Sequence, residues 1–239
     1  MNKDYCIQGT KIVMRRIFKA ELDDVIGCYA DYEKLYHNLV NRRFIESCLV
    51  YGEIWGAFWN ESLIAACYYF PLDSSFYTLT PSYGAICDFI EKSDEYFYIG
   101  YIGIKHDKIK EISREKNCAQ PSFGGLYTVF LNIGHTQGFR RGFKKLIHTL
   151  PVKLHFDIEP MFCNGYRMSK MRGLDKLVVH YIFEKDVLSC ESICTRTETV
   201  NADIKDTKKI SALLESGYSG IDIDKTAGSL LLCPLVSDN

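Results

Sequence analysis

Apolar and polar positions in the first part of the chain predict a strand, two helices and a hairpin. Residues 10–18, "TKIVMRRIF", have the branched and apolar character of a strand. In residues 19–50 apolar positions recur at helical spacing, first from Leu22 to Tyr29 and again from Tyr32 to Val40, which predicts two consecutive helices. The runs "GEIWGAFWN" and "SLIAACYYFPL" are rich in strand formers and meet at the turn-forming "NES", as a β-hairpin would.

Residues 73–150 show a less regular pattern. The segment "SYGAICDFIEK" fits a helix, "EYFYIGYIGI" a strand, and "HDKIKEISREKNCAQPSFGG" a polar stretch with a turn-prone end. "LYTVFLNIG" then reads as a strand and "RRGFKKLIHTL" as a short basic helix. No internal repeat or low-complexity linker is evident. We therefore predict one domain spanning residues 1–239, with residues 73–150 inserted in it.

The next segment predicts a strand that leads through a basic loop into a helix. In "PVKLHFDIEP", apolar residues alternate with polar ones as in a half-buried strand. "CNGYRMSKMRGLDKLVVHYIFEK" begins polar and basic, and then places apolar residues on one helical stripe from Leu174 to Ile182. Helix N-termini expose unpaired N–H groups, which favour phosphate groups. The loop before this predicted helix is therefore a candidate anion site.

The C-terminal segment predicts the order strand, helix, strand, strand. The helix is "DTKKISALLESGY", whose Ile210, Leu213 and Leu214 form one apolar stripe before a glycine stop at Gly217. The strands are "SICTRTETVNAD" before the helix and "SGIDID" and "SLLLCPLV" after it.

Composition excludes several classes of protein. Lys plus Arg (29) balance Asp plus Glu (30), so no net field attracts nucleic acid or an anionic membrane. No run approaches the roughly 18 apolar residues of a membrane span, and the N-terminus lacks the apolar core of a signal peptide. The ten cysteines are scattered without any C-x-x-C pair, which argues against a metal site. We expect a cytoplasmic protein with reduced and mostly buried thiols.

The order of predicted elements resembles that of the GNAT superfamily of acyl-CoA N-acyltransferases, and two motifs carry the likeness. "IEP" at Ile158–Pro160 and "KMRGLD" at Lys170–Asp175 resemble the family's V-x-P strand end and its [QR]-x-x-G-x-[GA] loop, whose amides hold the coenzyme A pyrophosphate. "DTKKISALLESGY" resembles N-x-x-A-I-x-L-Y-E-x-x-G-F, the fourth helix of that family. The resemblance implies an α/β (α+β) fold with a mixed central sheet flanked by helices, and an inserted segment between the third and fourth core strands.

The same resemblance implies an acyltransferase that moves an acyl group, acetyl above all, from acetyl-CoA or another acyl-CoA to an amine of a small molecule or peptide. Glu159, at the end of the central strand, is the implied base, with His155 as a fallback. Cationic and backbone groups on either side of the basic loop would hold coenzyme A. These residues are Ile158, Arg167, Lys170, Arg172, Gly173 and Leu174.

Two departures from the family pattern support other functions. Asp175 stands where a small residue lets phosphate approach, and Leu213 stands where many family members have a tyrosine general acid. A catalytically silent GNAT-like protein that binds acyl-CoA or a protein partner is therefore the main alternative. A thiol hydrolase using Cys163 with His155 or His180 is a third, although no motif supports it. Turnover with acetyl-CoA separates the first two, and inactivation by iodoacetamide would favour the third.

Overall fold

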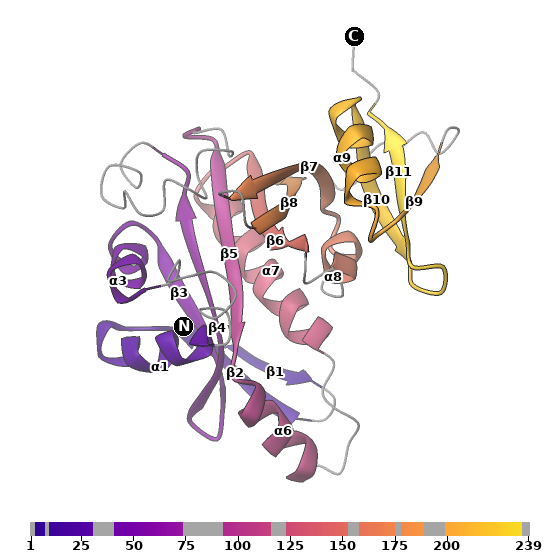
Figure 1. Cartoon of the computed structure of the whole chain (residues 1–239). Coiled ribbons are helices and arrows are strands. Elements are labelled where there is room, and N and C mark those ends of the chain that lie inside the picture. Colours follow the sequence, from indigo (N-terminus) through magenta and orange to yellow (C-terminus); the bar gives the residue numbers. More distant parts are fainter. Residues whose placement is uncertain are drawn as a thin grey trace. The chain divides into compact units, whose positions relative to one another are not determined.

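A computed structural model describes residues 3–7, 10–30, 41–73, 93–115, 123–152, 158–174, 178–188 and 199–235 of the chain. Figure 1 shows the strands and helices of the chain in the colours of the sequence. They divide into two compact units, Met1–Gly134 and His135–Asn239, with the division inside one helix.

The first unit is built on five antiparallel strands that lie side by side in chain order. They are β1 (Lys3–Ile7), β2 (Thr10–Arg16), β3 (Glu53–Trp59), β4 (Ser62–Pro71) and β5 (Tyr96–Ile104). The turn between β3 and β4 places Asn60 and Glu61 at positive φ, 46° and 63°. Two successive residues in this conformation form the tight turn that matches the twist of a hairpin. The predicted hairpin is thus confirmed.

Helices cover both faces of this sheet. They are η1 (Lys19–Glu21), α1 (Leu22–Cys28), α3 (Arg42–Tyr51), α6 (His106–Glu115) and the first part of α7 (Phe123–Arg140). On one face an aromatic cluster joins α3 to the sheet, with Phe44 edge-on to Tyr68 at 5.1 Å between ring centroids. On the other face, the Tyr69 hydroxyl donates a 2.9 Å hydrogen bond to the Phe130 carbonyl of α7. Aromatic side chains therefore fix helices to both faces.

Gly100 provides a test of this packing. A Cβ added at Gly100 would lie 2.1 Å from the Tyr68 ring, which is buried and held between other rings. We expect Gly100→Ala to lower the free energy of unfolding by about 2 kcal/mol, because overpacking a dense core forces its neighbours to shift. Gly27→Ala in α1 is the matched control, since its Cβ would contact only the flexible end of Lys105 at 3.4 Å. Urea denaturation measures both, and equal stability of the two variants would contradict the packing described.

The second unit contains six strands in the order β6-β8-β7-β10-β11-β9, all pairing antiparallel. The strands are β6 (Lys145–Pro151), β7 (Arg167–Leu174), β8 (Val178–Asp186), β9 (Val200–Asp203), β10 (Tyr218–Asp224) and β11 (Ser229–Pro234). In the described part of this unit they are accompanied by the last part of α7 and by α8 (Ile158–Cys163) and α9 (Thr207–Glu215). The C-terminal order of strand, helix, strand, strand is confirmed as predicted.

Two predictions between residues 106 and 151 are wrong, and one helix was not predicted. The polar segment from His106 contains this helix, α6, whose Ile109 and Ile112 are buried on one side. The predicted strand "LYTVFLNIG" lies within helix α7, and the predicted basic helix "RRGFKKLIHTL" contains strand β6. Strand β6 is buried on both faces from Leu146 to Pro151, so it lacks the alternation that marks a half-exposed strand.

The assignments around the predicted site are also wrong. Ile158 and Glu159 do not end a strand, because they open helix α8. The basic loop and following helix are instead the β7–β8 hairpin, a ladder that runs from Arg167↔Glu184 to Leu174↔Val178. The segment "VVHYIFEK" has apolar residues at helical spacing, but its branched and aromatic residues form a strand buried at Tyr181, Ile182 and Phe183.

Several predictions fall on residues outside the described ranges. They include the apolar stripe from Tyr32 to Val40, the helix "SYGAICDFIEK", and the positions of His155 and Asp175. The inserted segment at residues 73–150 is not confirmed, and strand β5 within it pairs with β4 as part of the first sheet. The single-domain assignment stays a prediction beside the two compact units.

Candidate functional site

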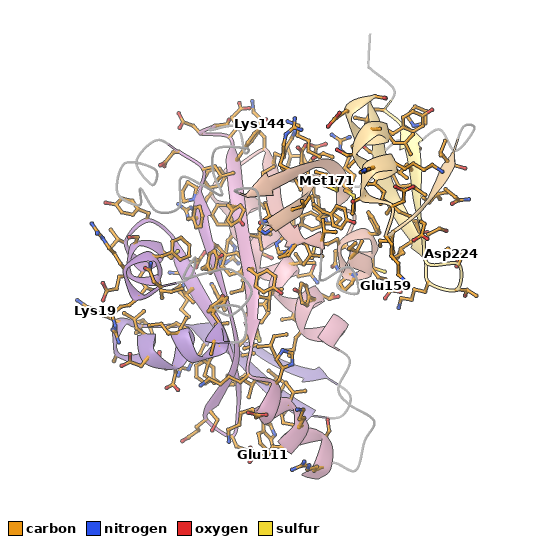
Figure 2. The ribbon with its side chains drawn as sticks, in the orientation of Figure 1. Lys19, Glu111, Lys144, Glu159, Met171 and Asp224 are labelled. Atoms are coloured by element: carbon orange, nitrogen blue, oxygen red, sulfur yellow. The ribbon has the colours of Figure 1, made fainter. Side chains whose placement is uncertain are left out.

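The residues predicted to bind the cofactor and to catalyse lie on two neighbouring elements of the second unit. Ile158 and Glu159 are on α8, whereas Arg167, Lys170, Arg172, Gly173 and Leu174 follow one another along β7. Ile158 is fully buried. The Glu159 carboxylate is 42% exposed and forms a 2.5 Å ion pair with Lys225, and Figure 2 shows Glu159 beside the turn that carries Asp224. Glu159 is thus engaged by a cation of the β10–β11 turn.

The strand conformation of β7 removes the reason for placing a pyrophosphate at Gly173. That prediction required a loop-to-helix junction with free amides, but Gly173 pairs with Val179 in the β7–β8 ladder. Arg172 is 49% exposed and lies 3.8 Å from Glu215 of α9. Lys170 is exposed on the same strand. The basic residues of β7 therefore form a charged strand surface without helix amides, and their role stays a prediction.

Helix α7 is a second element that begins with glycines. It is 18 residues long and begins Phe123-Gly124-Gly125. The pattern [QR]-x-x-G-x-[GA] matches residues 120–125 only at its first position, Gln120, and its last, Gly125, because Phe123 stands in place of the first glycine. This segment was not considered from the sequence, because "LYTVFLNIG" was interpreted as a strand.

Glu53 is the carboxylate with the most unusual surroundings. Its side chain is 6% exposed, and it is the only buried Asp or Glu among the residues that the structure describes. Its Oε2 accepts a hydrogen bond from Trp55 Nε1 at 2.9 Å and pairs with Arg16 at 2.6 Å. Its Oε1 is buried with no hydrogen-bond partner in the described structure. A buried carboxylate oxygen without a hydrogen-bond partner makes Glu53 a candidate functional residue.

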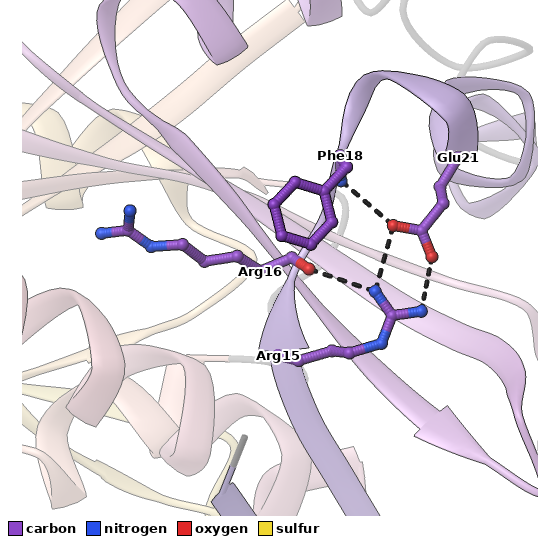
Figure 3. A network of polar contacts seen from close by, with 4 residues as sticks. All are labelled: Arg15, Arg16, Phe18 and Glu21. Carbon is purple, nitrogen blue, oxygen red and sulfur yellow. Dashed lines mark hydrogen bonds and ion pairs between the residues drawn. The ribbon is translucent and has the colours of Figure 1, made fainter. Parts of the chain in front are cut away.

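A second polar network orders the backbone next to Arg16. Arg15 donates two hydrogen bonds to the Glu21 carboxylate, at 3.0 and 2.5 Å, and Glu21 also accepts from the Phe18 amide (Figure 3). The Arg15 hydrogen bonds lower the pKa of Glu21, and the same bonds raise the pKa of Arg15. In Figure 3 the Arg16 side chain points away from this network. The Arg15–Glu21 hydrogen bonds thus fix the end of β2, and the Arg16 side chain pairs with Glu53 instead.

A hollow of about 280 Å³ lies at the turn of the β3–β4 hairpin. Its lining carries charges of both signs, with Asp24 paired to Lys105 at 3.0 Å. The lining residues are Glu21, Asp24, Phe58, Glu61, Ser62, Leu63, Lys105 and Lys108. Three carboxylates in one hollow repel a polyphosphate, so it suits a small molecule with mixed charges better than coenzyme A.

The thiol-hydrolase alternative gains nothing from the structure. Cys163 is exposed on α8, whereas His180 is buried in β8, where burial and the neighbouring His148 lower its pKa to about 4. Burial also raises the pKa of Cys28 to about 12, so this thiol is inert at neutral pH. Cys233 is disulfide-bonded, so the prediction of reduced thiols is wrong for Cys233.

The described residues contain neither a cluster of metal ligands nor a membrane-spanning helix. No three His, Cys, Asp or Glu side chains gather there as metal ligands would. No helix in the described ranges is long and apolar enough to cross a membrane.

Solved structures match the arrangement of these elements. An N-acetyltransferase from Staphylococcus aureus Mu50 superposes with a TM-score of 0.52 over 74% of this chain and 99% of its own, at 9% identity. A ribosomal-protein-alanine N-acetyltransferase from Brucella melitensis gives 0.50 over 72% and 98%, at 12% identity. This chain has the GNAT fold. An uncharacterized protein from Bacillus halodurans also matches, with a TM-score of 0.52 over 77% of this chain and 90% of its own at 8% identity.

The likeness to GNAT structures is one of fold, because the identities are too low to extend it to activity. No protein-family model matches the chain, and no curated protein matches it in sequence. The α/β architecture of sheets flanked by helices, inferred from the order of elements, is confirmed.

Proposed function

We propose that the protein is an acyltransferase that moves an acyl group, acetyl in the first instance, from an acyl-CoA to an amine of a small molecule or peptide. The observation that carries the proposal is the GNAT fold itself. It extends over 72–74% of this chain and almost the whole length of two structures named as N-acetyltransferases. The charge balance of 29 basic and 30 acidic residues suits a small molecule or peptide better than nucleic acid as partner.

The reaction requires a proton acceptor. The neutral amine attacks the thioester carbonyl carbon, a C–N bond forms, the C–S bond breaks, and coenzyme A leaves as its thiolate. One proton of the amine passes to a base and then to the thiolate sulfur, so the products are an amide and the thiol of coenzyme A. Both carboxylates pair with a cation, Glu53 through Oε2 with Arg16 and Glu159 with Lys225. Glu53 fits the role better because its Oε1 is buried without a hydrogen-bond partner, whereas the Glu159 side chain is 42% exposed. We therefore place the base at Glu53 and retain Glu159 as the alternative that the sequence suggests.

Coenzyme A requires a site for its pyrophosphate. The start of α7 combines two glycines, which permit close approach of the backbone, with the N-terminal end of an 18-residue helix, whose dipole favours an anion. The cations Arg167, Lys170 and Arg172 of β7 are the alternative site. The two sites carry different residues, so variants can separate them.

We expect Gly125→Asp to weaken coenzyme A binding about tenfold or more, because the new carboxylate repels the pyrophosphate. Aspartate in the first turn stabilises a helix, so the change should not unfold α7. The double variant Lys170→Glu with Arg172→Glu should retain the affinity of the parent. Calorimetry with free coenzyme A measures both, with Gly125→Ala as the control for the added Cβ alone.

If Gly125→Asp binds coenzyme A as tightly as the parent and the double variant binds it more weakly, the coenzyme A site lies on β7. Affinity for acetyl-CoA without turnover on any of a panel of amines would support the silent binding protein. Failure to bind acetyl-CoA, longer acyl-CoAs or free coenzyme A would overturn the proposed function.

A further inference from the structure

The second unit contains the same arrangement of elements twice. Strand β6, helix α8 and the β7–β8 hairpin are followed by strand β9, helix α9 and the β10–β11 hairpin. The sheet order is β6-β8-β7-β10-β11-β9, so it reads the same from either end when each strand is exchanged for its counterpart. A sheet order of this kind is produced by two equal βαββ modules that meet at one edge of each and are related by a two-fold axis.

Backbone details repeat at a constant spacing of 52 residues. Ile158 and Ile210 are both fully buried on their helices. Gly165 and Gly217 both have positive φ, 76° and 88°, and each is followed by a tyrosine. The amide of each glycine donates to the carbonyl three residues earlier. These shared helix ends were not evident from the sequence, because little else is identical between the two segments.

The hairpins repeat with the same spacing. The β7–β8 ladder is irregular between Met168 and Lys170, and the β10–β11 ladder between Gly220 and Asp222. These positions again differ by 52. The irregularities of the two hairpins therefore lie at equivalent residues, as two copies of one module would place them.

The two modules meet in the way a two-fold axis requires. Strands β7 and β10 pair at Gly220↔Met168, two residues that occupy the same position in their modules, so the axis passes between them. Each helix contacts the edge strand of the other module at which the two modules meet, α8 with β10 and α9 with β7. Each helix also offers a glutamate to the hairpin of the other module, as Glu159 pairs with Lys225 and Glu215 with Arg172.

We propose that residues 200–234 are a second copy of the module at residues 145–186 and serve as a built-in second subunit. The edge of β7 is then a self-complementary surface that fits a module of its own kind. In the intact chain β10 occupies this edge, which prevents two chains from pairing through it. An uncovered strand edge would otherwise offer its free amides and carbonyls to another chain. The inference does not depend on the proposed acyl transfer.

Gly220→Phe in the full chain tests the proposal. A Cβ at Gly220 would already lie 3.0 Å from the Cβ of Met168, so a phenyl ring cannot be accommodated and β10 must leave β7. We expect the particle mass of this variant, measured by analytical ultracentrifugation, to double relative to the parent. Asp222→Phe, at an exposed position of the same strand, should keep the mass of the parent. A folded Gly220→Phe variant with unchanged mass would overturn the proposal.

A cross-link tests the register of the new dimer. In a Gly220→Phe, Cys163→Ser background, Met168→Cys should form a disulfide between two chains, because residue 168 faces its own copy across the axis. Lys170→Cys should not, since the two copies would be displaced by about 13 Å along the strands. Equal cross-linking at both positions would contradict the proposed pairing. If circular dichroism shows that Gly220→Phe is unfolded, the same mass and cross-link measurements are made on Gly220→Ala, whose single added carbon is also crowded.

Discussion

Replacing Glu53 by Gln is expected to lower the rate of acyl transfer by about 100-fold or more, with little change in coenzyme A affinity. Glutamine has the shape of glutamate and can still accept the hydrogen bond from Trp55, but it cannot take a proton from the amine. We expect no other carboxylate to act as base in its place, because Glu53 is the only buried Asp or Glu in the described ranges. Steady-state kinetics with saturating acetyl-CoA measure the effect as kcat.

Glu159→Gln is the matched control for this prediction. It removes the ion pair with Lys225, which is largely solvated, so kcat should stay within a few-fold of the parent. A 100-fold loss in Glu159→Gln with normal activity in Glu53→Gln would move the base to α8. If Glu53→Gln lowers the melting temperature alone, Glu53 is a structural residue that holds Arg16 and Trp55.

The free energy of unfolding is expected to fall by about 3 kcal/mol between pH 6.5 and pH 4 through His180 alone. Burial, and secondarily the neighbouring His148, lower the pKa of His180 from 6.5 to about 4. In this window the unfolded chain binds a proton at His180 that the folded chain does not. Acid therefore favours the unfolded state. This part of the stability is present in full above pH 6.5 and is lost progressively as the pH falls to 4.

Urea denaturation between pH 4 and pH 7 tests this expectation. In the variant His180→Leu no proton can bind at this position in either state, so its stability should fall less steeply with acid than that of the parent. The two curves should differ most between pH 4 and pH 6. Parallel curves across the whole range would show that His180 does not titrate differently in the folded and unfolded states.

The parts of the fold that were predicted correctly are those with short-range signals. The β3–β4 hairpin has two strand-forming runs around Asn60 and Glu61, and asparagine is a residue that tolerates the positive φ of a tight turn. Helix α9 combines an Asp206 side chain that accepts from the Lys209 amide with a glycine after its last turn. Such caps and turns are encoded within a few residues, so they are recognisable without tertiary contacts.

Elements buried on several sides were predicted wrongly. Helix α7 buries Leu126, Tyr127, Phe130, Leu131 and Ile133, so its apolar positions form no narrow stripe. Its branched and aromatic residues then resemble those of a strand. In β8, the positions of Val178, Tyr181 and Ile182 fit a helical stripe equally well, and only pairing with β6 and β7 selects the strand.

The local structure of the candidate site was predicted wrongly for the same reason. With β8 interpreted as a helix, Gly173 became a helix start and the basic residues before it a phosphate loop. The glycines at the start of α7 were not considered, because the helix they begin was not recognised. Glu53 could not be singled out from sequence, because its burial depends on how β3 packs in the sheet.

Transfer of a labelled acetyl group from acetyl-CoA to an amine tests the proposed function most directly. The purified full-length chain is incubated with isotope-labelled acetyl-CoA and a panel of small-molecule and peptide amines, and mass spectrometry follows the label. The account predicts that label appears as an amide on at least one amine with release of one coenzyme A thiol per transfer, and that Glu53→Gln reduces this transfer about 100-fold. Absence of binding to acetyl-CoA, together with no labelled amide at any enzyme concentration, would contradict it.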